Sequence, residues 1–209
     1  MTFRIVCARY KEDISHLLPL SSIVTVMNKG NKNIPEDFLD IRVLENIGRE
    51  AHSYLSYIVQ QYESLPEVVV FTQAEFRDHF ATDSISVLLE LAQHAASVGF
   101  SRNPALVSSE PGGPAGRDFR LSNYNGPLEQ SEYCLGEWWD QCIVEPNFPE
   151  SEMYVYWGAI FATRKDRIKS RPKVFYQKLL ECLSSPSPET AHYMERSWFY
   201  IFNHHELLR

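Results

Sequence analysis

Three short and almost continuously apolar segments constrain the fold of this chain more than any other feature. They are residues 4–8 (RIVCA), 22–27 (SIVTVM) and 68–72 (VVVFT), and each contains β-branched residues. Strands that read as continuous apolar runs are usually covered on both faces, as in parallel sheets with helices on each side. The sequence therefore predicts an α/β protein with a mostly parallel central sheet.

Two helices are predicted around these segments. Residues 48–65 (GREAHSYLSYIVQQYESL) place apolar side chains at helical spacing, and so predict a crossover helix and a βαβ unit. The residues that form this apolar stripe are Ala51, Tyr54, Leu55, Ile58, Val59 and Tyr62. A second helix fits residues 84–98, with Asp83 placed to cap it.

The rest of the chain completes a three-layer sandwich, a sheet flanked by helices. Residues 101–131 are rich in Pro, Gly, Ser and Asn and predict a long loop. Residues 152–168 read as one or two strands leading into a short helix. Helices are expected over 172–183, opened by Pro172, and over 187–205. A length of 209 residues suits one domain spanning 1–209.

Charge and composition disfavour several classes of protein. A net charge of −7 argues against a broad electrostatic hold on nucleic acid or anionic membranes. No apolar run approaches the ~20 residues that a membrane span needs, and the first residues lack the shape of a signal peptide. The four cysteines have no CxxC spacing, which disfavours zinc and favours free buried thiols. A cytoplasmic protein without a membrane span is the expectation.

Polar segments follow each predicted strand, and they should meet at one rim of the sheet. They are ARYKED (8–13), NKG (28–30) and TQAEF (72–76), together with NIGRE (46–50) at the start of the crossover helix. In open α/β sheets, ligands bind beyond the carboxyl ends of the strands. This convergence predicts a binding site at that rim.

The GRE segment suits an anionic ligand. A helix N-terminus offers unpaired N–H groups and a partial positive charge, and Arg49 adds a planar cation suited to phosphate or carboxylate. The alternative is a turn glycine followed by solvated charges. At the end of the third strand, Gln73 and Glu75 supply one carboxylate where a D-x-D pair would hold a divalent cation. The alternative there is a strand that runs out into a polar loop.

The last predicted helix carries a candidate base. Glu195 lies among aromatic residues, a setting that raises a carboxyl pKa and suits general-base catalysis, although pairing with Arg196 is the alternative. His204 and His205 could bind a metal or phosphate, or simply favour the helix C-terminus. The tryptophans that could stack on a sugar ring, or only pack, are Trp138, Trp139 and Trp157.

Motifs such as GxSxG, GxxxxGK[ST], GxGxxG and HExxH are absent from the sequence, which argues against hydrolases, P-loop enzymes, Rossmann oxidoreductases and zincins.

Five blocks of the sequence together resemble one family. The blocks are VCARYKEDISHLLPL, VTVMNKG, NIGREAHSYLSYIVQQYESLPEVVVFTQ, WGAIFATRKDRIKSRPKVFYQKLL and ERSWFYIF. In order and spacing they are similar to the family catalogued as domain of unknown function 3431, in which Asn is usual at the position of Lys11. The layout of that family is in turn similar to nucleotide-sugar-dependent glycosyltransferases of the GT-A fold.

The resemblance implies a set of roles for individual residues. The implied binding residues of the site are Ala8, Arg9, Glu12, Asn46, Arg49, Gln73, Trp157 and Gly158. Among them, Trp157 and Gly158 would face the acceptor. Glu195 would be the catalytic base, and Arg49 would stabilise the departing diphosphate. Mn²⁺ or Mg²⁺ would lie at Glu75 and His204, and this chain departs from the usual D-x-D by having Q-A-E at residues 73–75.

The resemblance thus implies a glycosyltransferase, a hexosyl- or pentosyltransferase that moves a sugar from a nucleoside-diphosphate donor to a glycan or other hydroxyl acceptor. One alternative is a catalytically inactive GT-A-like domain that binds a sugar nucleotide or glycan. Another is an unrelated α/β enzyme acting on anionic substrates.

Overall fold

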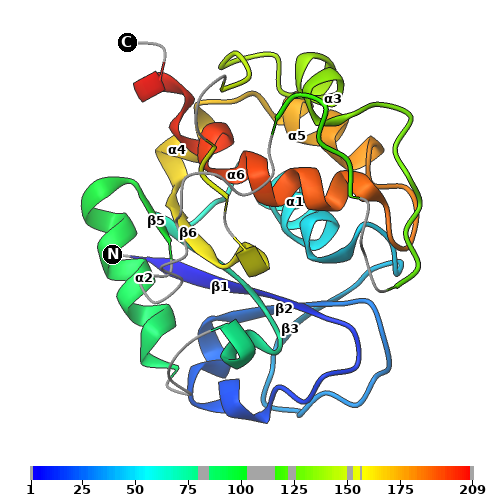
Figure 1. Ribbon diagram of the computed structural model, residues 1–209. Helices are drawn as coiled ribbons and strands as arrows, with labels where there is room; N and C mark the ends of the chain where they lie inside the picture. The colour runs from blue at the N-terminus through cyan, green and yellow to red at the C-terminus, as the bar shows by residue number, and fades with distance from the viewer. Residues whose placement is uncertain are drawn as a thin grey trace.

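A six-stranded sheet forms the centre of the protein (Figure 1). The computed structural model describes residues 2–79, 85–102, 116–121, 126–149, 153–155 and 157–207. The strands are β1 (Phe3–Arg9), β2 (Val24–Asn28), β3 (Asp40–Val43), β4 (Val68–Gln73), β5 (Phe100–Arg102) and β6 (Phe161–Arg164). Their order across the sheet is β3-β2-β1-β4-β6-β5.

The sheet is parallel on one side and antiparallel on the other. β1 pairs in parallel with both β2 and β4, and β2 pairs in parallel with β3. β6 pairs antiparallel with both β4 and β5. The predicted parallel arrangement is therefore confirmed for the strands of the N-terminal half, whereas β6 departs from it. The carboxyl ends of β1, β2 and β4 lie along one edge of the sheet, as the sequence predicted.

Strand β3 corrects the predicted βαβ unit. The second predicted strand does not lead directly into the crossover helix, because β3 follows it, and helix α1 (Arg49–Gln61) then connects β3 to β4. In β3 the charged residues Asp40 and Arg42 are half-buried, while Ile41 and Val43 are exposed. Asp40 accepts a hydrogen bond from Thr25 Oγ1 at 2.6 Å. Strand β3 was not predicted from the sequence, because its half-buried charged residues alternate with exposed apolar ones and form no continuous apolar run.

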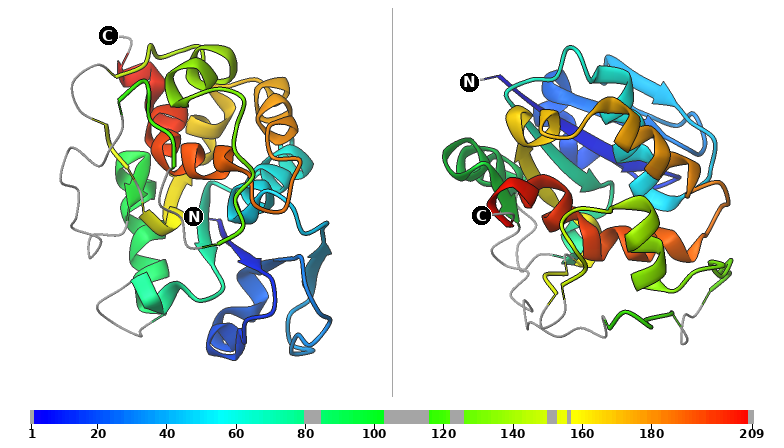
Figure 2. Two further views of the ribbon diagram at one scale, coloured as in Figure 1. Left: turned by 45° about the vertical axis from the view of Figure 1, so that its right-hand side comes forward. Right: turned by 90° about the horizontal axis from the view of Figure 1, so that it is seen from above.

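Helical segments cover both faces of the sheet and make three layers (Figure 2). On one face lie α1, α3 (Leu135–Cys142), α4 (Lys165–Lys169), α5 (Lys173–Glu181) and α6 (Glu189–Leu207). On the other lie the 3-10 segment η1 (Ser15–Ile23) and α2 (Ser86–Val98). Shorter 3-10 turns are η2 (Phe76–His79) and η3 (Trp157–Ala159). No helix in the described part of the chain combines the length and apolar character needed to cross a membrane.

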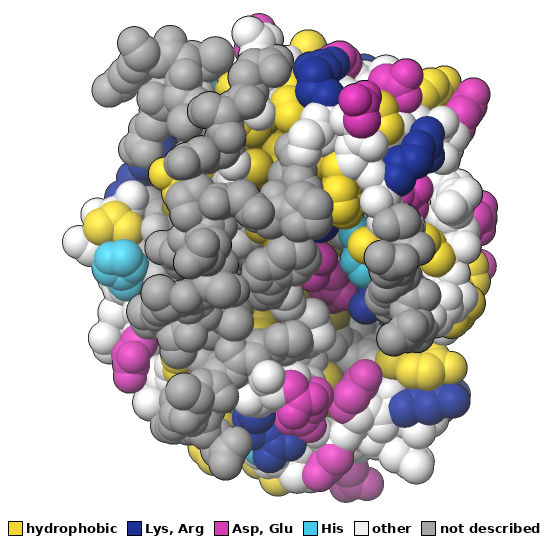
Figure 3. Space-filling model, in the orientation of Figure 1, with side chains coloured by type: hydrophobic (Ala, Val, Ile, Leu, Met, Phe, Trp, Pro, Cys, Tyr) yellow, Lys and Arg dark blue, Asp and Glu magenta, His cyan; other side chains and the backbone are white. Residues whose placement is uncertain are grey.

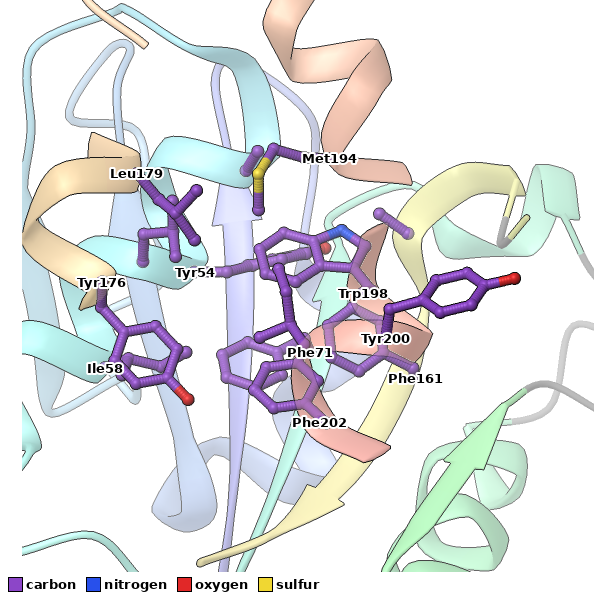
Figure 4. Close-up of a cluster of buried hydrophobic side chains, with 14 of the residues drawn as sticks. Tyr54, Ile58, Phe71, Phe161, Tyr176, Leu179, Met194, Trp198, Tyr200 and Phe202 are labelled. Carbon is purple, nitrogen blue, oxygen red and sulfur yellow. The ribbon is translucent and has the colours of Figure 1, made fainter. Parts of the chain in front are cut away.

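Aromatic side chains fill the core between α6 and the sheet (Figure 4). Trp198 and Phe202, one turn apart on α6, stack with ring centroids 5.9 Å apart. Phe161 of β6 lies 5.3 Å from Trp198, and Phe71 of β4 lies 5.2 Å from Phe161. The core on the opposite face is mainly aliphatic and centres on α2, for example at Leu88. This apolar packing accounts for the continuous apolar runs of β1, β2 and β4.

Several element boundaries differ from those predicted. The predicted loop of 101–131 begins later, because residues 100–102 form β5. Helix α3 was not predicted, and α5 begins at Lys173 with Pro172 in the N-cap position. Helix α2 begins at Ser86. The predicted cap Asp83 lies outside the described residues.

Candidate functional site

A pocket of about 310 Å³ opens where β1 and β4 end and α1 begins. Its lining residues are Ala8, Arg9, Tyr10, Glu12, Lys29, Asn46, Arg49, Glu50, Ser53, Gln73, Ala74, Glu75 and Pro186. All four polar segments that follow the predicted strands or begin the crossover helix contribute to this lining. On the face shown in Figure 3, acidic, basic and histidine side chains gather in a hollow near the middle.

Arg9 is almost completely buried at the end of β1 and organises the loop after β2. Its Nη1 donates to Asn28 Oδ1 at 2.8 Å and to the Asn31 carbonyl at 3.0 Å, and its Nη2 donates to Asn31 Oδ1 and to the Asn33 carbonyl, both at 2.9 Å. Its Nε donates to the Glu12 carbonyl at 2.9 Å. The guanidinium thus holds the pocket wall in place. A ligand at this position would contact the backbone or the aliphatic part of Arg9, because the guanidinium is already hydrogen-bonded.

The start of α1 has an unusual backbone that aims it at the pocket. Gly48 and Arg49 both have positive φ angles, 60° and 51°. The Gly48 N–H donates to the Ser185 carbonyl at 2.7 Å, and a Cβ on Gly48 would lie 2.7 Å from the Leu183 Cβ. A non-glycine residue held at positive φ is a strained conformation of the kind that clusters at functional sites. Gly48 therefore serves as a turn glycine, and its lack of a side chain also lets the start of α1 approach the segment of Leu183 and Ser185 closely.

Two carboxyl groups, an arginine and a histidine form a charged cluster beside the pocket. Arg49 Nε lies 3.8 Å from Glu50 Oε2, and Arg49 Nη1 lies 3.5 Å from His192 Nε2. His192 Nδ1 lies 3.6 Å from Glu195 Oε2. Burial raises the pKa of Glu50, and the negative charge of Glu195 raises it further. The cluster links the helix start to α6, so that Glu195 lies close to the pocket even though it is not one of its lining residues.

Lys29 supplies a second cation at the pocket. Its ammonium donates to the carbonyls of Ile47 and Arg49, which anchors the segment leading into α1. Burial lowers the pKa of Lys29 to about 8, an effect that the charge of Glu50 opposes. Lys29 therefore remains protonated at neutral pH. It lies within the predicted NKG segment, but sequence reasoning gave it no role, because any exposed loop lysine has the same local pattern.

The residues at the predicted D-x-D position are held by other parts of the protein. The Gln73 Nε2 donates to the Gly158 carbonyl at 2.7 Å. Both carboxylate oxygens of Glu75 accept from Arg77, from Nε at 2.7 Å and from Nη2 at 2.8 Å. This bidentate pair lowers the pKa of Glu75. Gly158 is thus brought to the pocket edge through its backbone, next to Gln73.

Other predicted residues lie elsewhere or are not described. His204 is buried on α6, with Nδ1 3.4 Å from Ser170 Oγ, and does not line the pocket. The side chains of Trp157 and His205 lie outside what the structure describes. Trp138 and Trp139 are buried in the core, which is the packing alternative. Within the described ranges, no group of three or more His, Cys, Asp or Glu side chains is arranged to hold a metal ion.

Two buried hydroxyl groups beside the cluster have no hydrogen-bond partner among the described residues. They belong to Ser53, which lines the pocket, and to Tyr54, its neighbour on α1. Buried hydroxyls without partners are uncommon, and at a pocket they are available to a ligand or to water. In the sequence, Tyr54 was predicted only as part of the apolar stripe of the crossover helix, and Ser53 was given no role.

Fold and site together define an α/β protein with a charged pocket at the carboxyl ends of parallel strands. The chain belongs to the family described as "Protein of unknown function (DUF3431)", whose family model matches residues 5–208. This match confirms the family resemblance carried by the five sequence blocks. No curated protein sequence matches the chain.

Proposed function

We propose that this protein is a GT-A-like glycosyltransferase that moves a sugar from a nucleoside diphosphate to a hydroxyl acceptor. One observation carries the proposal. The pocket gathers seven of the residues that the resemblance assigns to donor or metal binding, and it adds one further cation, Lys29. The seven are Ala8, Arg9, Glu12, Asn46, Arg49, Gln73 and Glu75.

The diphosphate would lie at the start of α1. Arg49 offers a guanidinium there, Lys29 is a protonated amine at neutral pH, and the helix dipole favours negative charge at this end. Preorganised cations of this kind stabilise the charge that develops on a leaving diphosphate. Because Gly48 has no side chain, no side chain at the N-cap position occupies the helix start.

The acceptor hydroxyl would lose its proton to Glu195. Two neighbouring carboxyl groups resist ionising together, and burial together with the charge of Glu195 raises the pKa of Glu50. Glu195 Oε2 lies 3.6 Å from His192 Nδ1, and Glu195 is the proposed base. Glu195→Gln should remove transfer while preserving donor binding, whereas the same loss in Glu50→Gln alone would assign the base to Glu50.

The proposed mechanism needs no metal ion at Glu75. Both oxygens of that carboxylate are engaged by Arg77, and the Gln73 amide is bonded to the Gly158 carbonyl. A hard divalent cation prefers several free oxygen ligands, which this arrangement does not offer. Binding of Mn²⁺ or Mg²⁺ with help from His204 stays a prediction, and the experiment below includes it.

The same contacts favour the second candidate function, a GT-A-like domain that binds a sugar nucleotide or glycan without transferring the sugar. In the Q-A-E segment, Gln73 is hydrogen-bonded to Gly158 and Glu75 is paired with Arg77, so that their side chains contact the protein itself and not a metal ion. Binding without turnover of any donor would favour this candidate over the transferase.

Thermal unfolding with a panel of nucleoside diphosphates and sugar nucleotides, each with and without Mn²⁺, tests the proposal. A ligand that binds only the folded protein, at about 100 times its Kd, should raise Tm by roughly 5–10 °C. Sugar transfer or donor hydrolysis is then assayed with the donor that gives the largest shift. A shift that depends on Mn²⁺ would support the predicted metal site.

Two arginine variants make the binding test specific. Arg49→Ala should abolish the shift, and it leaves a non-glycine residue at the same backbone position. Arg164→Ala is the matched control, because its side chain is similarly exposed (36% against 33%) and it is paired with Asp166. Equal shifts in both variants, or no shift with any nucleotide, would contradict the proposal.

A further inference from the structure

Two cysteines from distant parts of the chain meet on the face opposite to the aliphatic core. Cys142 is the last residue of α3, and Cys182 follows the last residue of α5. Their sulfur atoms are 3.2 Å apart, although 40 positions separate them in the sequence. Both are free thiols, and both are partly exposed. The expectation of buried thiols thus holds for Cys7 and is wrong for this pair.

The surroundings of the pair give it the properties of a reactive dithiol. Cys142 lines a second pocket, of about 270 Å³, which opens between α3 and the start of α5 and gives a small molecule access. The pKa of Cys182 is lowered to about 7, mainly by the hydrogen bond with Cys142, and partial burial opposes this effect. The same interaction raises the pKa of Cys142. Cys182 is therefore the sulfur that begins to ionise near neutral pH, while Cys142 keeps its proton.

We propose that Cys142 and Cys182 are a redox site that closes to a disulfide with hydrogen peroxide and reopens with a dithiol reductant. A disulfide S–S bond is about 2.05 Å long, so the two sulfur atoms need to approach by only about 1 Å. This short approach between two partly exposed sulfur atoms, one of which lines a pocket, distinguishes the pair from Cys7 and Cys134.

The chemistry balances in two steps. The Cys182 thiolate attacks one peroxide oxygen and breaks the O–O bond, which leaves a sulfenic acid on Cys182 and a hydroxide that takes up a proton to become water. The Cys142 sulfur then attacks the Cys182 sulfur, the S–S bond forms, and the sulfenic hydroxyl leaves with the Cys142 proton as a second water. The two thiols lose two electrons and the peroxide gains them.

The disulfide would secure a segment that also reaches the candidate functional site. The Cys182 carbonyl accepts from Thr190 Oγ1 at 2.6 Å, close to the start of α6. A few residues on, the Ser185 carbonyl accepts from the Gly48 N–H, and Pro186 lines the first pocket. Oxidation therefore joins α3 to the segment that packs against the start of α1.

Peptide mapping of the folded protein tests the redox site. The protein is treated with hydrogen peroxide, its remaining thiols are alkylated, and it is digested without reduction. We expect two of the four cysteines to escape alkylation. A single cross-linked peptide should contain Cys142 and Cys182, and dithiothreitol should restore both thiols.

Two serine variants separate the pair from the other cysteines. In Cys142→Ser the cross-link should vanish, and a sulfenic-acid reagent should label Cys182. Cys134→Ser, at the start of the same helix, should cross-link as the unaltered protein does. Alkylation of both Cys142 and Cys182 after peroxide treatment, or cross-links that join other cysteines, would overturn the proposal. The mapping of the unaltered protein decides the matter even where a variant does not fold.

Discussion

At the residue scale, the guanidinium of Arg9 forms its hydrogen bonds with the protein itself. A guanidinium has five N–H donors, and those of Arg9 reach Asn28, Asn31, Asn33 and the Glu12 carbonyl. The sequence could place Arg9 at the pocket, because it directly follows a predicted strand. It could not show where the side chain points, because the acceptors are backbone carbonyls and amides of a loop that only the fold brings near.

Arg9→Lys should destabilise the protein by about 2–4 kcal/mol, because a lysine cannot replace a planar, multidentate donor and leaves buried acceptors without partners. Urea unfolding monitored by circular dichroism measures the change. Arg77→Lys is the control, since Arg77 forms a partly exposed ion pair with Glu75 and its replacement should change stability by less than about 1 kcal/mol. Equal effects of the two substitutions would mean that the Arg9 network contributes little.

Glu50 should make stability depend on pH in an identifiable direction. Its pKa is raised in the folded protein above the ordinary 4.5, so the stability it contributes is complete below that pH and is lost as pH rises through the folded value. Glu50→Gln removes this titration. We expect the variant to gain stability relative to the unaltered protein as pH rises above 4.5, as measured by urea unfolding at each pH.

Glu75→Gln provides a control of opposite sign. The pKa of Glu75 is lowered by Arg77, so its contribution is present above the ordinary 4.5 and is lost as pH falls. The difference between this variant and the unaltered protein should shrink toward acid pH. If the stability difference from the unaltered protein varied with pH in the same direction for both glutamine variants, the opposite pKa shifts of Glu50 and Glu75 would be refuted.

At the element scale, the direction of α1 depends on one glycine. Gly48→Ala would place a Cβ 2.7 Å from the Leu183 Cβ at a positive φ, and should destabilise the protein by about 1–3 kcal/mol. Gly116→Ala is the matched control, because a Cβ there meets no atom within 4 Å. Thermal and urea unfolding of both variants should show a loss only for the first. A neutral Gly48→Ala would show that α1 can shift without penalty.

Elements with a strong apolar pattern were predictable from the sequence. Strands β1, β2 and β4 and helices α1, α2, α5 and α6 all lie within or close to their predicted ranges. The missed elements are short or have reversed patterns. β5 has three residues, α3 follows a segment rich in proline and glycine, and β3 turns its charges inward. Their positions depend on tertiary contacts, which no local pattern records.

At the scale of the whole molecule, two cores share one sheet. Phe161 belongs to the aromatic core under α6, and Leu88 of α2 belongs to the aliphatic core on the opposite face. Phe161→Ala should lower the free energy of unfolding by about 3–5 kcal/mol, and Leu88→Ala should lower it by about 2–5 kcal/mol. Because the strands contribute side chains to both faces, each variant should unfold in one transition.

Coincidence of near-ultraviolet and far-ultraviolet circular dichroism transitions measures this cooperativity. Val174→Ala, at an exposed position of α5, is the surface control and should change stability little. Separate transitions in either core variant would show that the faces unfold independently.

Strand β3 has a consequence for how separate molecules behave toward one another. It is at one end of the strand order, so that no other strand among the described residues pairs with one side of its backbone. Open edges of this kind are where sheets of different molecules join, and inward-pointing charges such as Asp40 and Arg42 are a known protection against joining. The exposed Ile41 and Val43 oppose that protection. In concentrated solution, aggregation of the native protein should therefore begin along this strand, and lysine at position 41 should delay it.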